Sequence, residues 1–321
     1  MGFDPIATDG HLKKIQSAVE GNLAGHSAIV ASWRRSLLHH GILAERDKTA
    51  HVLTESELSD IRLAQDRLMY VARPILEDLF QSVGLSGFTV VLSDRNGVLI
   101  DQISNDYDEP DFQSAGLKLG SVWAESHQGT NAIGTVAVEQ RPMVVVKDQH
   151  YMCSATPLTC VGAPIFDPSG QVTAVLDVTS ARADTDVASA QFLLPIITTT
   201  ANRIESEYFR ACFETANIFV AKGYSNIGTP LLAADDDDLV VGANRAARKL
   251  LKIKGDFLER GTPRRDLLNR AAQPRGLEAA ERSAIKRAIA RNDGIMSKAA
   301  KDLGVSRATF YRMLDRHGLK K

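Results

Sequence analysis

The chain has 321 residues, of which 44% are hydrophobic and 24% charged, and its net charge at pH 7 is −1. This is ordinary globular composition with room for two or three domains. No apolar run approaches the roughly 20 residues of a membrane-spanning helix, and the first residues lack the basic and apolar stretches of an export signal. The three cysteines, Cys153, Cys160 and Cys212, are then expected to stay reduced. We therefore expect a cytoplasmic protein with no membrane partner.

The N-terminal region, residues 1–83, is expected to be helical. Apolar side chains recur at helical spacing over residues 29–38 and again over residues 58–79. Thr54-Glu-Ser-Glu57 has the pattern of a capping box, which places the start of the second helix. Pro74 is expected to kink or split that helix, because proline removes a backbone hydrogen bond.

After Gly84 the pattern changes to strands. Strands are predicted over residues 88–93, 98–100, 132–138, 143–147, 159–166 and 172–178. Asn96-Gly97 is a strong signal for the turn between the first two. A long helix follows over residues 188–213. Six strands flanked by helices predict an α+β domain, residues 84–213, with a mostly antiparallel sheet.

Residues 214–254 predict a smaller unit. A strand, the acidic turn Asp235–Asp238, a second strand and a helix capped by Asn244 follow one another, which resembles the opening of a PAS domain without its remainder. The aspartates are interpreted as a solvated turn, and we expect neither a metal site nor another cofactor. Residues 255–276 are basic and contain several Gly and Pro residues, which predicts a linker.

Residues 277–321 predict a helix-turn-helix. Apolar positions at helical spacing cover residues 277–292, a short helix over residues 297–303 ends at Gly304, and Ser306 caps a third helix, residues 307–317. This segment contains eleven Lys and Arg against five Asp and Glu, a difference of +6 in a chain whose total charge is −1. Such a concentration of positive charge predicts double-stranded DNA as the partner.

The segment Ala299-Ala-Lys-Asp-Leu-Gly-Val-Ser-Arg-Ala-Thr-Phe-Tyr-Arg-Met-Leu-Asp-Arg-His-Gly-Leu319 resembles the DNA-binding domains of the Fis family. In that family the cap and the next residues of the third helix face bases and phosphates. The resemblance therefore implies that the DNA contacts are Lys298, Ser306, Arg307, Thr309, Tyr311, Arg312 and Arg316. Of these, Lys298 and Arg316 would contact phosphate. Because the nucleoid protein Fis is basic where Tyr311 and Asp315 stand here, its base preference is not implied.

Four further motifs resemble the sensory half of the acetoin and glycerol catabolism regulators, over about residues 20–255. They are Ser32-Trp-Arg-Arg-Ser36, Gly129-Thr-Asn-Ala-Ile-Gly134, Thr159-Cys160 followed by Ala163-Pro-Ile-Phe-Asp-Pro-Ser-Gly170, and Ala174-Val-Leu-Asp-Val178. The order of the strands likewise matches the GAF sensor fold. The resemblance implies a GAF-type antiparallel sheet with flanking helices, followed by the PAS-like remnant and an all-α Fis-type helix-turn-helix.

In GAF domains a small ligand usually lies between the sheet and the loops over one face. Here residues 121–131 and 148–156 would form that cover, with these ligand-binding candidates: Trp123, Glu125, His127, Asn131, His150, Tyr151 and Cys153. An aromatic wall with a few polar groups suits a small polar metabolite. The alternative is that Trp123 and Tyr151 are core residues, that Asn131 caps a helix, and that the domain is a dimerisation platform. A redox switch at Cys153 and Cys160 is a further alternative, although their spacing does not mark a zinc site.

Full-length members of the resembling family place an ATPase domain between sensor and helix-turn-helix, and use it to remodel sigma-54 polymerase. Here residues 214–276 are too few for that domain, and no Gly-x-x-x-x-Gly-Lys-[Ser/Thr] or Gly-Ala-Phe-Thr-Gly-Ala loop occurs. The sequence therefore predicts a homodimeric transcriptional regulator with a ligand sensor. It would not be an enzyme and would act without ATP hydrolysis and independently of sigma-54. The alternative is an architectural or co-regulatory DNA-binding protein working beside RNA polymerase or a second regulator.

Overall fold

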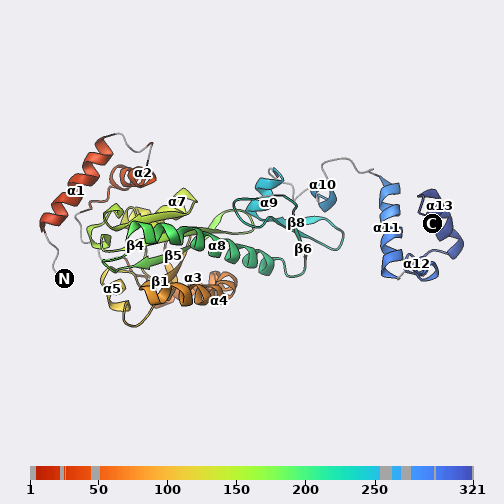
Figure 1. Ribbon diagram of the computed structural model, residues 1–321, viewed down its shortest axis with the longest axis horizontal. Helices are drawn as coiled ribbons and strands as arrows, with labels where there is room; N and C mark the ends of the chain where they lie inside the picture. Colours follow the sequence, from red (N-terminus) through yellow and green to blue (C-terminus); the bar gives the residue numbers. More distant parts are fainter. Residues whose placement is uncertain are drawn as a thin grey trace. The chain divides into compact units, whose positions relative to one another are not determined.

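The computed structural model describes residues 5–21, 25, 27–44, 51–223, 225–253, 262–268, 276–292 and 294–319. They form two compact units, Met1–Arg264 and Arg265–Lys321. Figure 1 colours the elements in chain order. Among the helices of the described residues, none is long and apolar enough to cross a membrane.

The first unit is built on a five-stranded antiparallel sheet of order β2-β1-β5-β4-β3. The strands are β1 (Phe88–Asp94), β2 (Leu99–Ile103), β3 (Met143–Val146), β4 (Thr159–Phe166) and β5 (Val172–Ser180). The predicted turn joins β1 to β2, where Asp94 Oδ1 accepts from the backbone N–H groups of Asn96 and Val98. Every residue of β1 and β4 is buried, because both faces of the sheet are covered. The predicted α+β class with an antiparallel sheet is confirmed.

One predicted strand is wrong, since residues 132–138 lie in helix α7 (Ala132–Glu139). Asn131 caps this helix, its Oδ1 accepting from Gly134 N at 2.8 Å. The run Ala-Ile-Gly-Thr-Val-Ala-Val is apolar because the short helix is buried on most sides, and such a run cannot be distinguished from a buried strand by its pattern. The sheet therefore has five strands where the sequence predicted six.

Two long helices, α4 (Asp66–Val83) and α8 (Val187–Cys212), cover one face of the sheet. The capping box at Thr54 starts the preceding helix, α3 (Glu55–Ala64), as predicted. The expected split at Pro74 is wrong, because the helix continues through Pro74 and the division falls earlier, at Gln65. Pro74 is on the exposed side of α4, where water can bond the carbonyl that proline leaves without a donor.

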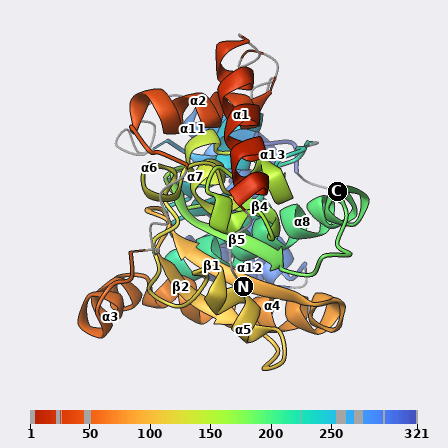
Figure 2. The same ribbon diagram turned by 90° about the vertical axis from the view of Figure 1, so that its left-hand side faces the viewer.

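The other face of the sheet lies beneath short elements and an N-terminal arm, residues 5–44. The arm contains α1 (Pro5–Glu20), α2 (Ala28–Arg34) and a π-helical turn (Arg35–His39). Beneath it are α5 (Glu109–Ser114), α6 (Glu125–Gln128), α7, and 3-10 turns at Lys147–Gln149 and Cys153–Ala155. Figure 2 shows α1 and α2 on the side of α6 and α7, away from α4. One hydrophobic cluster joins arm, cover and sheet through residues such as Trp33, Tyr151 and Val91.

A second, three-stranded sheet completes the first unit. Its order is β6 (Asn217–Val220), β7 (Leu231–Ala234) and β8 (Val240–Ala243), and α9 (Arg245–Leu250) follows, capped by Asn244 as predicted. The sequence did not predict β6, whose residues are exposed or only partly buried. Of the predicted linker, the structure describes residues 262–268 and 276, including α10 (Arg264–Leu268), while residues 255–261 and 269–275 lie outside the described part.

In the second unit, residues 276–292 and 294–319 form a domain of three helices. It consists of α11 (Leu277–Arg291), α12 (Met296–Asp302) and α13 (Arg307–Arg316), which confirms the three predicted helices within a residue or two at their ends. Its core contains Ile285, Ala288, Ala299, Ala300, Phe310 and Leu314. Gly304 adopts φ +66° in the turn, a conformation that suits glycine, and Ser306 Oγ accepts from Thr309 N as the cap of α13. Asp293, part of the predicted end of the first helix, is outside the described residues.

Candidate nucleic-acid interface and sensor interior

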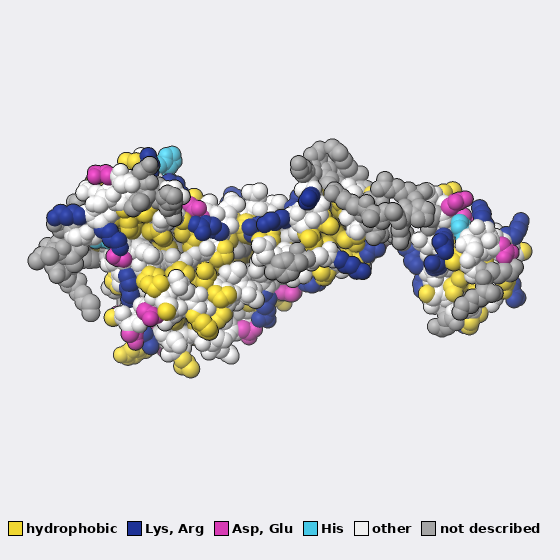
Figure 3. Space-filling view, turned by 45° about the horizontal axis from the view of Figure 1, so that its top comes forward, with side chains coloured by type: hydrophobic (Ala, Val, Ile, Leu, Met, Phe, Trp, Pro, Cys, Tyr) yellow, Lys and Arg dark blue, Asp and Glu magenta, His cyan; other side chains and the backbone are white. Residues whose placement is uncertain are grey.

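The third helix of the second unit separates a packing face from an exposed face. Phe310 and Leu314 are buried in the core, whereas Arg307, Arg312 and Arg316 are exposed. Because residues four apart lie on one side of a helix, Arg312 and Arg316 share a face. Figure 3 shows Lys and Arg side chains over the visible surface of this domain. A helix with a buried stripe and an exposed basic stripe has the form that fits a DNA groove.

The other predicted DNA contacts surround the start of α13. Lys298 and Ser306 are exposed, while Thr309 and Tyr311 are partly buried. Ser306 Oγ and Thr309 Oγ1 are 2.9 Å apart, and the Arg307 guanidinium lies 5.9 Å from the centroid of the Tyr311 ring. These contacts order the first turn of α13 and hold Arg307 at the surface.

A carboxylate of α11 fixes the other end of α13. Glu281 accepts from Arg316 at 2.9 Å and lies 3.0 Å from His317 Nε2. Arg316 is therefore paired within the protein, although its side chain is 56% exposed. The sequence did not predict the role of Glu281, because that role depends on the packing of α11 against α13, which brings together residues 35 positions apart.

In the first unit, a buried ion pair joins the N-terminal arm to the cover. Glu125, the first residue of α6, is 2% exposed and accepts from Arg35 Nε at 2.6 Å and from Ser32 Oγ at 2.7 Å. The hydrogen bonds to Glu125 raise the pKa of Arg35 above its usual value. Ser32 Oγ also lies 2.6 Å from Thr130 Oγ1. Glu125, predicted as a ligand contact, thus bonds the Ser32–Arg35 segment of the arm in this structure.

Trp123, Asn131 and Tyr151 are buried and bonded to the protein itself. Trp123 Nε1 donates to Ser121 Oγ at 3.1 Å. Asn131 Nδ2 donates to the Trp123 carbonyl at 2.9 Å, and Tyr151 Oη donates to the Ile42 carbonyl of the arm at 2.7 Å. These contacts match the core-and-cap roles that the sequence left open as the alternative.

The cover is packed closely against its surroundings. At Gly129, φ is +64° and an added Cβ would lie 2.5 Å from the Tyr151 ring. The remaining candidates differ in position: His150 is fully buried, Cys153 is partly buried, and His127 is exposed, with Nδ1 3.1 Å from Ser126 Oγ. His127 therefore does not line the interior in this arrangement.

A chain of polar side chains crosses the cover side of the sheet. His150 Nδ1 donates to the Lys147 carbonyl at 3.0 Å, which leaves Nε2 as an acceptor for the thiol of Cys160 at 3.3 Å. Thr179 Oγ1 lies 3.2 Å from Cys160 Sγ and also bonds Asp177. Burial lowers the pKa of His150 to about 4 and raises that of Cys160, so the imidazole is neutral and the thiol protonated at pH 7.

Asp177 belongs to this series of hydrogen-bonded polar side chains, and the sequence analysis did not predict it as a site residue. It stands at the middle of β5, fully buried, between Val91 of β1 and Gly162 of β4. Burial raises its pKa to about 7. Among the described residues, neither its Oδ1 nor Ser93 Oγ on β1 has a hydrogen-bond partner. The signal in the sequence was a carboxylate inside the apolar strand Ala174-Val-Leu-Asp-Val178, since such a group is rarely buried without a role.

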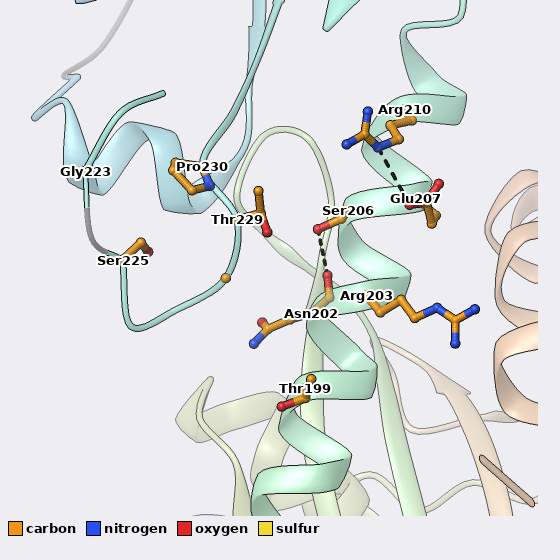
Figure 4. Close-up of a pocket in the computed structure, with 11 residues that line it drawn as sticks. Thr199, Asn202, Arg203, Ser206, Glu207, Arg210, Gly223, Ser225, Thr229 and Pro230 are labelled. Atoms are coloured by element: carbon orange, nitrogen blue, oxygen red, sulfur yellow. Dashed lines mark hydrogen bonds and ion pairs between the residues drawn. The ribbon is translucent and has the colours of Figure 1, made fainter. Parts of the chain in front are cut away.

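A polar groove of about 600 Å³ lies elsewhere in the first unit, between α8 and the loop before β7. Thr199, Asn202 and Ser206 of α8 point toward the loop residues Thr229 and Pro230, whereas Arg203 points away from that loop (Figure 4). Among the described residues, no group of three or more His, Cys, Asp or Glu side chains is placed to hold a metal ion. Cys153, Cys160 and Cys212 all lie in the described part of the chain, and none of them forms a disulfide bond.

Both halves of the chain match known families. The model described as the MimR N-terminal domain matches residues 12–205, more than half of the chain, and the model for bacterial regulatory proteins of the Fis family matches residues 276–317. Residues 206–275 lie between the two matches. This interval, like the rest of the sequence, lacks a Gly-x-x-x-x-Gly-Lys-[Ser/Thr] phosphate loop.

Several characterised regulators are similar in sequence. The acetoin catabolism regulatory protein of Cupriavidus necator is 31% identical over 240 residues, which cover 73% of this chain and 36% of that protein. The propane 2-monooxygenase operon transcriptional activator MimR of Mycolicibacterium smegmatis is 28% identical over 155 residues, 48% of this chain and 25% of that protein. The matches thus span about a third or less of the length of these relatives.

A solved structure shares the fold. The crystal structure of the E. coli DhaR(N)–DhaL complex contains a chain that aligns with a TM-score of 0.51 at 17% identity, covering 81% of this chain and 86% of that one. This likeness supports the α+β fold of the first unit, and the Fis-family match places a helix-turn-helix after it. The chain therefore belongs to the family defined by the MimR N-terminal domain, and its residues 276–317 match the helix-turn-helix of bacterial regulatory proteins of the Fis family.

Proposed function

We propose that this protein is a transcriptional regulator that binds specific DNA sites through α13 and senses a small polar metabolite in the interior of its first unit. The DNA-binding part of this proposal rests on the exposed basic face of α13, a helix whose other side buries Phe310 and Leu314. Arg307 and Arg312 lie at the start and middle of the exposed face, the part of a recognition helix that reaches base edges. Lys298, Ser306, Thr309, Tyr311 and Arg316 complete the proposed contact set.

The test is a gel-shift measurement on DNA fragments selected by the protein, with scrambled fragments as competitors. Arg307→Ala or Arg312→Ala should each cost about 1–3 kcal/mol of binding, because a bidentate or phosphate contact is lost. Arg287→Ala, which removes the same charge from the exposed side of α11, is the control and should cost less. Unchanged affinity in both α13 variants would exclude this contact set. Equal affinity for selected and scrambled DNA would favour the architectural or co-regulatory alternative.

The proposed sensor is the interior between the cover and the sheet. The residues proposed to bind the metabolite are Trp123, Glu125, Asn131, His150, Tyr151 and Cys153. The similarity to regulators named for acetoin and propane metabolism supports a small organic effector. The arm bonds both cover segments, at Glu125 and at Tyr151, so opening the interior must displace the arm. A ligand that prefers the open or closed arrangement would thereby shift the population of arm positions. No enzymatic activity is proposed.

We also propose a homodimer in the cytoplasm. Tyr70 on α4 is 82% exposed and Phe192 on α8 is 74% exposed, which supports these helices as the contact between subunits. A dimer would present two recognition helices to half-sites about one DNA turn apart. Light scattering at micromolar concentration should give twice the monomer mass, and Phe192→Asp should shift it toward the monomer. A monomeric wild type that stays monomeric on DNA would contradict this proposal.

Regulation is proposed to be independent of ATP and of sigma-54. The phosphate loop that remodelling activators need is absent from the sequence, so the protein would act on RNA polymerase directly or through a second regulator. In vitro transcription with housekeeping or sigma-54 polymerase tests this. Stimulation of the sigma-54 enzyme alone, in an ATP-dependent manner and without a second activator, would contradict it.

A further inference from the structure

Glu281 of α11 bonds two consecutive side chains at the end of α13. Its Oε1 accepts from Arg316 Nη2 at 2.9 Å, and its Oε2 accepts from His317 Nε2 at 3.0 Å. Because a carboxylate oxygen accepts hydrogen bonds, the second bond places a proton on Nε2 of His317. Figure 1 shows α11 and α13 side by side in the second unit. One carboxylate therefore uses both of its oxygens to hold the last turn of α13.

The two partners of Glu281 differ in their exposure to solvent. The side chains of His317 and Glu281 are 6% and 21% exposed, whereas that of Arg316 is 56% exposed. The bond to His317 lies near the core and fixes the carboxylate, while the guanidinium of Arg316 lies at the surface. Glu281 could thus follow Arg316 toward another anion only by leaving His317.

This ion pair changes what Arg316 can offer to DNA. Arg307, Arg312 and Arg316 are the exposed arginines of α13, and binding to DNA of arbitrary sequence comes almost entirely from such cations on phosphates. Arg316 is paired with a carboxylate, so a phosphate can bind it through that edge only in competition with Glu281. The pair therefore lowers the positive charge that α13 presents to phosphates.

We propose that Glu281 is a specificity-determining residue, which restrains Arg316 and thereby weakens binding to DNA of arbitrary sequence. Complexes on arbitrary sequence are held by phosphate contacts, so each available cation contributes fully there. On a preferred site, base contacts near the start of α13 fix the orientation of the helix, and a released Arg316 adds less. This inference rests on the proposed DNA binding through α13 and adds the residue that limits its non-specific part.

The experiment measures binding of the full chain to selected and scrambled DNA fragments by fluorescence anisotropy at several salt concentrations. Glu281→Gln keeps the shape of the side chain and removes its charge. Affinity for the scrambled fragment should rise by about two- to fivefold, the amount that a partly exposed ion pair provides. The slope of log K against log salt should steepen by about 0.9, the value for one more phosphate contact. The ratio of selected to scrambled affinity should fall.

Two further variants separate the restraint from a general effect of charge. Glu278→Gln removes a charge from an exposed position of the same helix, and it should raise the affinity less and leave the slope unchanged. In the Arg316→Gln protein, adding Glu281→Gln should have no more effect than Glu278→Gln has, because the restrained cation is gone. A destabilised helix-turn-helix would bind more weakly, so misfolding cannot imitate the expected gain.

The other outcomes overturn the proposal in distinguishable ways. Weaker binding or a shallower slope in folded Glu281→Gln would mean that the pair positions Arg316 on a phosphate. An equal gain in the Arg316→Gln background would mean that Glu281 acts only through its charge. If Arg307→Ala and Arg312→Ala lose affinity while Glu281→Gln binds as the wild type does, the role of Glu281 alone is wrong. If the wild type binds neither fragment, the proposed DNA-binding function fails with it.

Discussion

The buried pair of Arg35 and Glu125 gives the sharpest quantitative prediction. Glu125 has a side chain that is 1% exposed, and Arg35 Nε bonds it at 2.6 Å. Arg35→Met would leave the buried Glu125 carboxylate with the hydroxyl of Ser32 as its remaining bond in this network, and it would also remove the 2.8 Å ion pair between Arg35 and Glu139. Removing one partner of a buried pair typically costs about 3–5 kcal/mol. Since the Arg35 side chain is 30% exposed and water can replace part of it, we expect a loss of about 3 kcal/mol in the free energy of unfolding.

The assay is urea denaturation followed by tryptophan fluorescence. The chain has two tryptophans, Trp33 and Trp123, and both are buried in the cluster that joins arm and cover. With a denaturant slope of about 2 kcal/mol per molar, the midpoint should fall by about 1.5 M. Arg203→Met is the control, because Arg203 and Asp78 are 58% and 62% exposed and such pairs contribute about 0–1 kcal/mol.

A double variant tests the physical reason for the loss. Arg35→Met combined with Glu125→Met removes both charges, so the second substitution should restore at least half of the stability lost by the first. If Arg35→Met costs no more than Arg203→Met, the arm is not held by this pair. If the double variant is as unstable as the sum of the two single variants, the two residues are not coupled.

Three further predictions follow from buried groups. Burial raises the pKa of Glu205 on α8 from 4.5 to about 7, so the folded state binds more protons than the unfolded one between these values. Stability should then fall as pH rises from 4.5 to 7, by about 3 kcal/mol for this group, and urea titrations of Glu205→Gln should show a flatter profile. Phe310→Ala should cost the helix-turn-helix about 3–5 kcal/mol and abolish gel shifts, while tryptophan-detected unfolding of the first unit stays unchanged. Gly134→Ala should destabilise the first unit by more than 1 kcal/mol in the same unfolding assay, since its Cβ would lie 2.3 Å from Glu125 N; wild-type stability in that variant would show that α7 can shift.

The local patterns of the sequence predicted many elements correctly, and the reason differs between them. The capping box at Thr54, the turn after Asp94 and the cap at Ser306 depend on residues within four positions, and all are present. The strand predicted over residues 132–138 failed because a helix buried on most sides and a buried strand share one apolar pattern. The split predicted at Pro74 was wrong for a different reason. The effect of a proline depends on whether the carbonyl that it leaves without a donor faces solvent, and the sequence pattern does not show this.

The sequence by itself determined the two classes of unit, since hydrophobic periodicity, caps and the local excess of Lys and Arg are properties of neighbouring residues. It also predicted which arginines lie on the exposed face of α13. Only the tertiary structure decided which polar groups meet in the interior: Ser32 and Glu125 are 93 residues apart in the chain. Asp177 and Ser93 become neighbours only through the antiparallel register of β1 and β5. Burial and register are set by contacts between distant segments. Whether a carboxylate in an apolar strand has a hydrogen-bond partner is therefore decided only when the sheet and its cover are assembled.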